Sequence, residues 1–166
     1  MVGGAQPVTA VVRRLAPWEW EAWRVVRLRA LAEDSAAFGS TYDREAAWSD
    51  EEWRTRTAAL TPFVVEEEGH LVASAGLVTD AEGVSHLVAM WVDPKARRRG
   101  IGTSLLDAVV EVCHDTGHRV LRLGVTQDNQ AARSLYWRYG FVETGRSTPL
   151  ARDWRVIEHE MELKLR

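Results

Sequence analysis

Several features that mark other protein classes are missing from this sequence of 166 residues. Its one cysteine, Cys113, has no partner for a disulfide within the chain, which fits a reducing compartment. No apolar run approaches the roughly 18 residues that a membrane-spanning helix needs. The opening residues, MVGGAQPVTA, have neither the basic start nor the apolar segment of a signal peptide. We therefore expect a cytoplasmic protein without a membrane partner, in which residues 1–7 form a flexible leader.

A surplus of basic charge is also missing, because the net charge is −3 at pH 7. This balance argues against a general nucleic-acid-binding protein, which usually carries a basic excess. Basic residues do gather at one place, where Lys95 and Arg97–Arg99 fall within five residues. Such a spot suits a small polyanion better than a long one. We expect no nucleic-acid partner, and nucleic-acid binding around Arg97–Arg99 is the weaker alternative.

Motifs for metal ions and for the best-known phosphate sites are absent as well. The 5 histidines do not cluster with cysteines or carboxylates at ligand spacing, so we predict no metal. The P-loop string GxxxxGK followed by Ser or Thr does not occur. The dinucleotide-binding fingerprint GxGxxG is absent too, because Gly100-Ile101-Gly102 is not followed by a third glycine at position 105. A phosphate bound at the basic spot must therefore be held in another way.

The periodicity of the chain predicts one domain, residues 1–166, of mixed αβ class. The predicted strands are residues 8–15, 63–67, 71–78, 85–92, 120–126, 141–144 and 155–163. The predicted helices are residues 18–32, 49–59, 102–116 and 130–139. Residues 33–48 lack a clear period and are predicted to be a loop or a broken helix. The order of elements predicts that strands 85–92 and 120–126 pair in parallel, with helix 102–116 as their connection.

The segment between strand 85–92 and helix 102–116 has the form of a phosphate-binding loop. The first N–H groups of a helix have no intrahelical partner, and the helix dipole adds positive charge there. A pyrophosphate fits such an end where side chains do not block it. Gly100 and Gly102 supply that access, Thr103 adds a hydroxyl donor, and the neighbouring arginines add charge. The loop therefore predicts a bound pyrophosphate.

Two motifs make this prediction more specific. The string Arg97-Arg98-Arg99-Gly100-Ile101-Gly102 matches the pattern Q/R-x-x-G-x-G/A, and NQAARSLYWRYGF, which starts at Asn129, matches NxxAxxLYxxxGF. With both motifs, residues 63–141 resemble the GNAT N-acetyltransferases. The resemblance implies a twisted central mixed sheet flanked by helices, with its parallel strand pair splayed at the cofactor. It also implies transfer of the acetyl group of acetyl-CoA to a primary amine, which attacks directly in a ternary complex.

The resemblance also implies roles for particular residues. Tyr136 matches the general acid that protonates the leaving thiolate, a role that suits a phenol because it holds its proton at neutral pH. Backbone groups at the end of strand 85–92 would pair with the pantetheine arm, and those of Arg98–Thr103 would hold the pyrophosphate. Asn129 would contact the cofactor or fix the splay of the two strands. The implied cofactor-binding residues are Met90, Trp91, Val92, Arg97, Arg98, Arg99, Gly100, Ile101, Gly102, Thr103 and Asn129.

The sequence does not assign the general base. Bacterial ribosomal-protein alanine acetyltransferases carry a Glu five residues before the equivalent of Asn129, and this chain has Gly124 there. His86 is our candidate for a base or proton relay, because imidazole titrates near neutral pH. Glu82 and Glu45 are weaker candidates that would act through water. Orientation of the two substrates is a further alternative, since it supplies much of the rate in some reactions without a base.

The acceptor is a small-molecule or peptide amine whose identity stays open. Peptide N-termini, lysines, polyamines, amino acids and aminoglycosides are all compatible with the sequence. Residues 33–48 and the loop 146–153 are expected to flank the slot, and the aromatic and acidic side chains of the first segment suit a cationic amine. The sequence also leaves a homodimer open. The rival function is a non-catalytic acyl-CoA-sensing module on the same fold, against which the presence of Tyr136 argues.

Overall fold

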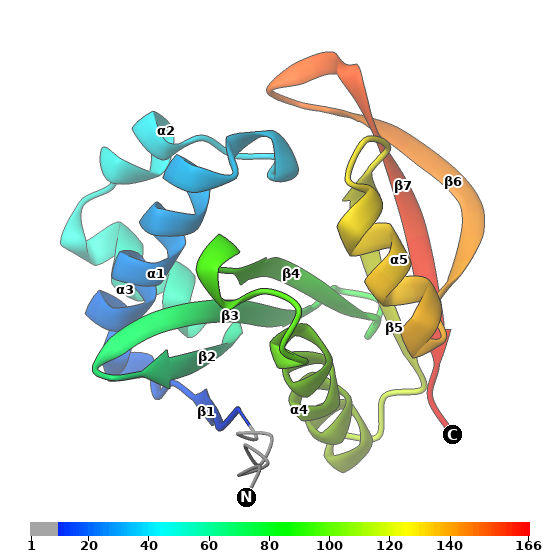
Figure 1. The fold of residues 1–166 in the computed structure, drawn as a ribbon, viewed down its shortest axis with the longest axis horizontal. Coiled ribbons are helices and arrows are strands. Elements are labelled where there is room, and N and C mark those ends of the chain that lie inside the picture. The colour runs from blue at the N-terminus through cyan, green and yellow to red at the C-terminus, as the bar shows by residue number, and fades with distance from the viewer. Residues whose placement is uncertain (1–9) are drawn as a thin grey trace, which may run out of the picture.

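The computed structural model describes residues 10–166, which form one seven-stranded sheet with helices on both faces (Figure 1). The strands are β1 (Val12–Arg14), β2 (Thr61–Glu67), β3 (His70–Thr79), β4 (Ser85–Val92), β5 (Val120–Thr126), β6 (Val142–Leu150) and β7 (Asp153–Lys164). The helices are α1 (Trp20–Glu33), α2 (Tyr42–Ala46), α3 (Asp50–Ala58), α4 (Ile101–Asp115) and α5 (Gln130–Tyr139). The strand order is β1-β2-β3-β4-β5-β7-β6. No helix within residues 10–166 is long and apolar enough to cross a membrane.

The predicted mixed αβ sheet is confirmed, and β5 has the predicted bounds. Residues 33–48 contain a short 3-10 turn (Ser35–Ala37) and α2, as expected for a broken helix. The predicted leader, residues 1–7, and the first part of the predicted strand 8–15 lie outside the described residues.

The C-terminal hairpin differs from the prediction. β6 runs to Leu150 and β7 starts at Asp153, so most of the predicted loop 146–153 is strand. Pro149, which argues against a strand in the sequence, pairs with Ile157 of β7. Because β6 is the last strand of the sheet, the missing N–H of a proline is tolerated there. The prediction of a loop at this position was therefore wrong.

The parallel pair β4–β5 is splayed, as predicted. The two strands pair only at their N-terminal ends, Ser85 with Leu121 and His86 with Arg122. Farther along, β4 stays paired with β3 and β5 stays paired with β7, but β4 and β5 separate. The sheet is therefore open as a slot along the C-terminal halves of these two strands, which is where open α/β sheets usually bind ligands.

A bulge in β4 redirects its side chains beside this slot. Between Val88 and Trp91, β4 has one residue more than the strand opposite, β3. Ala89 takes the left-handed conformation (φ 53°), and its carbonyl accepts a hydrogen bond of 2.8 Å from the hydroxyl of Ser74 on β3. Leu87 and Trp91 would share one face of a regular strand, yet they pack in different cores. The sequence predicts an uninterrupted strand here and does not reveal the bulge.

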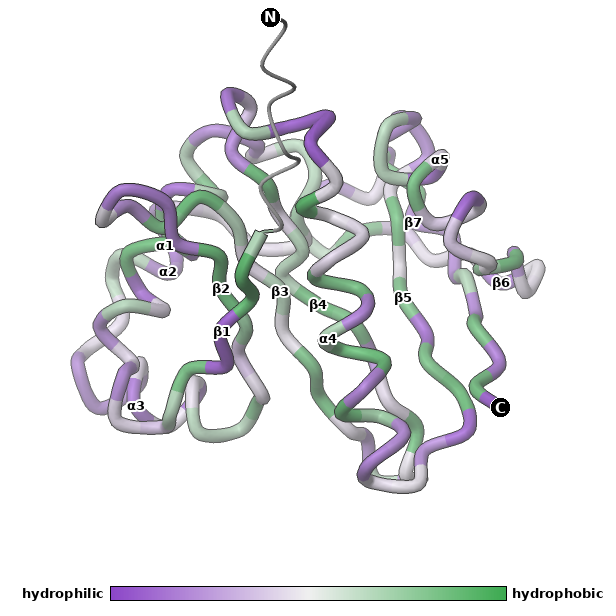
Figure 2. Tube along the Cα trace, turned by 60° about the horizontal axis from the view of Figure 1, so that its bottom comes forward, coloured by the Kyte–Doolittle hydropathy of each residue, from purple (hydrophilic) through white to green (hydrophobic). Residues whose placement is uncertain are grey.

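Two hydrophobic cores lie on opposite faces of the sheet. On β2, Phe63 and Val65 belong to the core that includes α4, whereas Val64 between them belongs to the core that includes α1. Figure 2 shows α4 crossing its face of the sheet with apolar and polar segments in alternation, because one side of the helix packs inward. Cys113 lies on this apolar side and is fully buried. Each core fixes one wall of the slot in place.

Candidate active site

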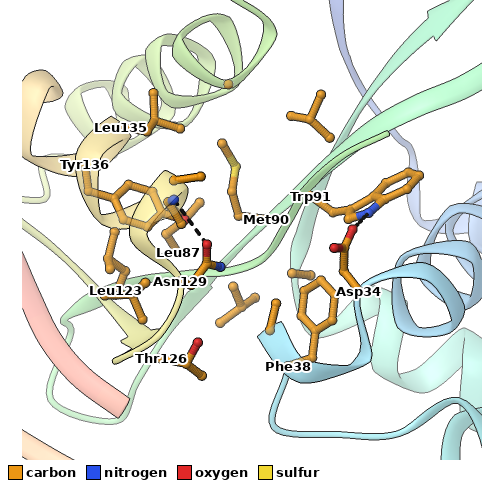
Figure 3. Close-up of a pocket in the computed structure, with 18 of the residues that line it drawn as sticks. Asp34, Phe38, Leu87, Met90, Trp91, Leu123, Thr126, Asn129, Leu135 and Tyr136 are labelled. Atoms are coloured by element: carbon orange, nitrogen blue, oxygen red, sulfur yellow. Dashed lines mark hydrogen bonds between the residues drawn. The ribbon is translucent and has the colours of Figure 1, made fainter. Parts of the chain in front are cut away.

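A cavity of about 930 Å³ occupies the slot between β4 and β5. It is lined by residues 87–92 of β4, residues 123–126 of β5, most of the loop 96–103, one side of α5, and residues 37–40. We call the side built by α4 and α5 the α4–α5 wall, and the side built by α1 and residues 34–40 the α1 wall. Figure 3 shows Leu135 and Tyr136 on the first wall and Asp34 and Phe38 on the second. The cavity therefore reaches both faces of the sheet.

The start of α4 presents unpaired backbone donors to the cavity. Gly100 precedes the helix in the left-handed conformation (φ 80°), and its carbonyl accepts the first helical hydrogen bond, of 3.0 Å, from the N–H of Ser104. The N–H groups of Ile101–Thr103 therefore have no helical partner, and these residues line the cavity. Together with the helix dipole, they make an anion site of the kind that the sequence predicts.

The three arginines of the motif have different surroundings. Arg97 donates to the carbonyl of Val92 (2.9 Å) and to Asp34 (2.7 Å), so its guanidinium is held at the cavity edge. Arg99 lies outside the cavity lining and makes two hydrogen bonds to Glu67, of 3.0 and 2.5 Å. Arg98 lines the cavity, and within residues 10–166 its side chain has no ion-pair partner. Of the three, Arg98 is the one whose side chain is available to a phosphate.

One face of α5 adds residues that sequence reasoning missed. Ala131, Ser134, Leu135 and Arg138 line the cavity at the spacing i, i+3, i+4, i+7, which was visible in the sequence. Arg138 brings a further cationic side chain to the cavity, and within residues 10–166 it has no ion-pair partner. A Cβ atom on Gly102 would lie 2.8 Å from Leu135 Cδ2, so this glycine lets the start of α4 approach α5. The expected reason for Gly102 was access for a phosphate, and close helix packing is an additional one.

Tyr136 brings a phenol hydroxyl to the α4–α5 wall. Its side chain is buried against Phe141, with ring centroids 5.6 Å apart in an edge-on arrangement, and it lines the cavity. Burial raises the pKa of its hydroxyl well above the usual value, so the phenol is protonated at neutral pH. Tyr139 has a different environment, because its hydroxyl donates to Asp107 at 2.7 Å and lies outside the cavity lining. The geometry thus favours Tyr136 over Tyr139 as a proton donor.

Asn129 lies where β5 ends and α5 begins. Its side-chain oxygen accepts a hydrogen bond of 3.2 Å from the N–H of Ala132, which caps the helix and is drawn as the dashed line at Asn129 in Figure 3. Asn129 also lines the cavity. It therefore fixes the first turn of α5 relative to β5, and within residues 10–166 the amide nitrogen of its side chain has no hydrogen-bond partner.

The three base candidates from the sequence do not meet at the cavity. His86 lies where β4 and β5 are still paired, and its Nε2 is bonded to Asp80 at 2.7 Å. Glu82 lies in the exposed turn before β4. Glu45 is buried, and both of its oxygens accept hydrogen bonds of 3.0 Å from Arg27. Because none of the three lines the cavity, we do not retain His86, Glu82 or Glu45 as the base.

The α1 wall is held by polar contacts between distant segments. Asp34 accepts hydrogen bonds of 2.7 Å from both the indole N–H of Trp91 and the guanidinium of Arg97, which ties the end of α1 to β4 and to the phosphate loop. Arg152, at the tip of the β6–β7 hairpin, donates to the carbonyls of Phe38 (2.5 Å) and Ala36 (2.9 Å). The two segments that were expected to flank the slot are therefore in direct contact beside it.

Glu158 of β7 is an acidic residue of the cavity that sequence reasoning missed. In the sequence it is one of three glutamates, with Glu160 and Glu162, that alternate along a strand and so share a face. Which of them reaches the slot depends on the register between β5 and β7, which the sequence does not show. Burial raises the pKa of the Glu158 carboxyl above its usual value. Within residues 10–166, no group of three or more metal-binding side chains is placed to hold a metal ion.

Comparison with known proteins agrees with this geometry. The chain is 33% identical over 107 residues to the L-amino acid N-acyltransferase MnaT of Escherichia coli (strain K12), a match that covers 61% of this chain and 60% of that protein. It is 37% identical over 111 residues to the peptidyl-lysine N-acetyltransferase YiaC of the same organism, which covers 65% of this chain and 70% of that protein. The chain thus spans less than two thirds of the length of MnaT.

Solved structures show the same fold. An acetyltransferase of the GNAT family from Streptococcus pneumoniae superposes with a TM-score of 0.78 at 18% identity, over 95% of this chain and 100% of that one. The acetyltransferase YncA from Salmonella typhimurium, solved with its cofactor acetyl-CoA, superposes with a TM-score of 0.70 at 20% identity, over 95% of each chain. Residues 13–141 match the sequence profile of the Acetyltransferase (GNAT) family, and this chain therefore belongs to that family.

Proposed function

We propose that the protein is an acetyl-CoA-dependent N-acetyltransferase, a single-domain cytoplasmic enzyme that acetylates a primary amine by direct attack in a ternary complex. The observation that carries this proposal is one continuous cavity, which joins the unpaired N–H groups at the start of α4 to the buried phenol of Tyr136. Acetyl-CoA has a pyrophosphate and a thioester at separate positions along one extended molecule, so it suits such a cavity. Two relatives are named for action on L-amino acids and on peptidyl lysine, which supports an amine acceptor.

The slot offers backbone groups for the arm of the donor. Beyond its first two residues, β4 has no partner on β5, so edge N–H and C=O groups of Met90–Val92 can pair with the pantetheine amides as an added strand would. The N–H groups of Ile101–Thr103 would hold the pyrophosphate, and Arg98 and Arg138 would add charge. The backbone N–H groups that follow the bulge at Ala89 are our candidates for stabilising the oxyanion.

Tyr136 is our candidate for the proton donor to sulfur. The amine nitrogen forms a bond to the carbonyl carbon, the carbon–sulfur bond breaks, and the phenol gives its proton to the departing thiolate. The raised pKa keeps the phenol protonated until that moment, because burial disfavours the charged form. The tyrosinate is then reprotonated through water from the ammonium-like nitrogen of the product. Free CoA and the N-acetyl amine leave.

Substitution of Tyr136 by Phe tests this function. We expect kcat to fall by roughly 10²-fold or more, the range for loss of a general acid. The Kd for acetyl-CoA, measured by calorimetry, should stay within about twofold because the ring is retained. Tyr139→Phe is the matched control, since it removes a hydroxyl from the same helix outside the cavity.

The assay follows CoA release with acetyl-CoA and a panel of L-amino acids, a lysine-containing peptide and spermidine. Wild-type turnover in Tyr136→Phe would remove this residue from the acid role. A wild-type protein that binds acetyl-CoA but releases no CoA with any amine would favour the acyl-CoA-sensing alternative instead.

A further inference from the structure

Glu158 occupies space that a side chain at position 124 would otherwise fill. Thr126 is the cross-strand partner of Glu158, and Gly124 lies diagonally beside it. A Cβ atom on Gly124 would lie 2.8 Å from Glu158 Cγ and closer still to Cδ and Oε1. The carboxylate therefore rests on the Cα of Gly124, and only glycine leaves this space free.

The carboxylate lies on the opposite face of β5 from Tyr136. Leu123 and Val125 belong to the core that includes Tyr136, so the residue between them, Gly124, faces the other way. Glu158 covers Gly124 on that other face, and both Glu158 and Tyr136 line the cavity. The cavity thus has a proton donor on one face of the open sheet and a carboxylate on the other. An amine attacks a thioester from one face of its planar carbonyl group, so a base on one side of the slot and a proton donor on the other can act on the same thioester.

Glu158 is also the carboxylate of this region that lacks a partner. Within residues 10–166 its side chain makes no hydrogen bond or ion pair. The other carboxylates of the cavity and of this face of β7 already have partners: Asp34 pairs with Arg97, Glu160 accepts a hydrogen bond from Thr144, and Glu162 pairs with Arg122. A partly buried carboxylate without a cation is favoured to bind one that arrives with a ligand.

We propose that Glu158 binds the ammonium group of the acceptor and removes its proton, an inference that rests on the N-acetyltransferase function proposed above. One proton moves from the acceptor nitrogen to a carboxylate oxygen of Glu158 and then to solvent, which leaves a neutral amine in the slot. That amine attacks the thioester, and its next proton replaces the one that Tyr136 gives to sulfur. The raised pKa of the Glu158 carboxyl favours this step, because it reduces the difference between the pKa of the base and that of the ammonium group, which is about 10.4 for an alkylamine. The acceptor class is therefore a cationic primary amine.

The test compares Glu158→Gln with Glu160→Gln in the CoA-release assay, using the best amine of the panel above across the pH range. Glu160 is the matched control, because it lies on the same face of β7 and outside the cavity lining. We expect kcat/KM of Glu158→Gln to fall by roughly 10²-fold at about pH 7. The deficit should shrink towards about pH 10, where the neutral amine forms without help. Acetyl-CoA affinity should not change.

A second variant tests the position of the carboxylate rather than its charge. Gly124→Ala places a methyl group where Glu158 rests, so the Glu158 side chain must move away from its place beside β5. We expect Gly124→Ala to lower kcat/KM in the wild-type background and to have no added effect in Glu158→Gln, because both changes remove the same group. A deficit of Glu158→Gln that is equal at all pH values, or full activity of this variant, would overturn the inference. An inactive wild-type protein would refute the proposed function itself.

Discussion

Removal of Arg27 should destabilise the protein far more than removal of a neighbouring arginine on the same helix. The side chains of Arg27 and Glu45 are 14% and 4% exposed, and two hydrogen bonds of 3.0 Å join them. Arg27→Met leaves the carboxylate of Glu45 buried without a partner, which costs about 3–5 kcal/mol in comparable pairs. For a chain of this length, that corresponds to a fall in Tm of about 6–20 °C.

The control for this prediction is an exposed ion pair that joins α1 to α3. Arg24 and Asp50 are 43% and 63% exposed and lie 3.3 Å apart, so Arg24→Met should cost at most about 1 kcal/mol. The double variant Arg27→Met/Glu45→Met should regain most of the lost stability, because two apolar side chains replace the buried pair. Urea unfolding and differential scanning calorimetry measure all three proteins. Equal losses for Arg27→Met and Arg24→Met would refute this reasoning, as would a double variant less stable than the single one.

Two further changes test the phosphate loop. Arg98→Ala should weaken acetyl-CoA binding by about tenfold, or about 1.4 kcal/mol. Arg99→Ala should leave the Kd within about twofold, because Arg99 is hydrogen-bonded to Glu67 outside the cavity. Titration calorimetry at low and high salt measures both variants, and equal Kd values for the two would contradict this expectation. Gly100→Ala should lower stability by roughly 1–2 kcal/mol through the left-handed backbone alone, since its Cβ meets open space. A Tm equal to that of the wild type would contradict the second expectation.

The sequence predicted the elements of the slot well, for physical reasons. The phosphate loop depends on local chemistry: glycine at a left-handed position, Gly100, and a helix start with unpaired N–H groups. The splay was implied by the family resemblance and is confirmed by the short pairing of β4 with β5. Tyr136 and Asn129 lie on one short helix and its cap, so their spacing in the sequence fixes their spacing in the fold.

What the sequence did not show depends on register and on distant pairing. His86 shares a strand with the slot residues, yet β4 has not separated from β5 at its position. Glu158 reaches the slot only because β7 pairs with β5 in one particular register, and because Gly124 leaves room beside it. Glu45 is acidic and close in sequence to the slot-forming segment, but Arg27 has already bound both of its oxygens. The type and sequence position of a single residue do not show which distant residue it will pair with in the fold.

The same opening that makes the site also divides the sheet into two parts, β1–β4 and β5-β7-β6. They are joined in the sheet by two residue pairs at one end of β4 and β5, whereas longer runs of paired residues join the strands within each part. The unpaired backbone groups along the opening are tolerated because they face a cavity rather than an apolar interior. The phosphate loop follows the first part, whereas Tyr136 and Glu158 belong to the second. A donor that lies in the slot would therefore contact both parts, and we expect its binding to supply across the opening the backbone pairing that the two strands lack.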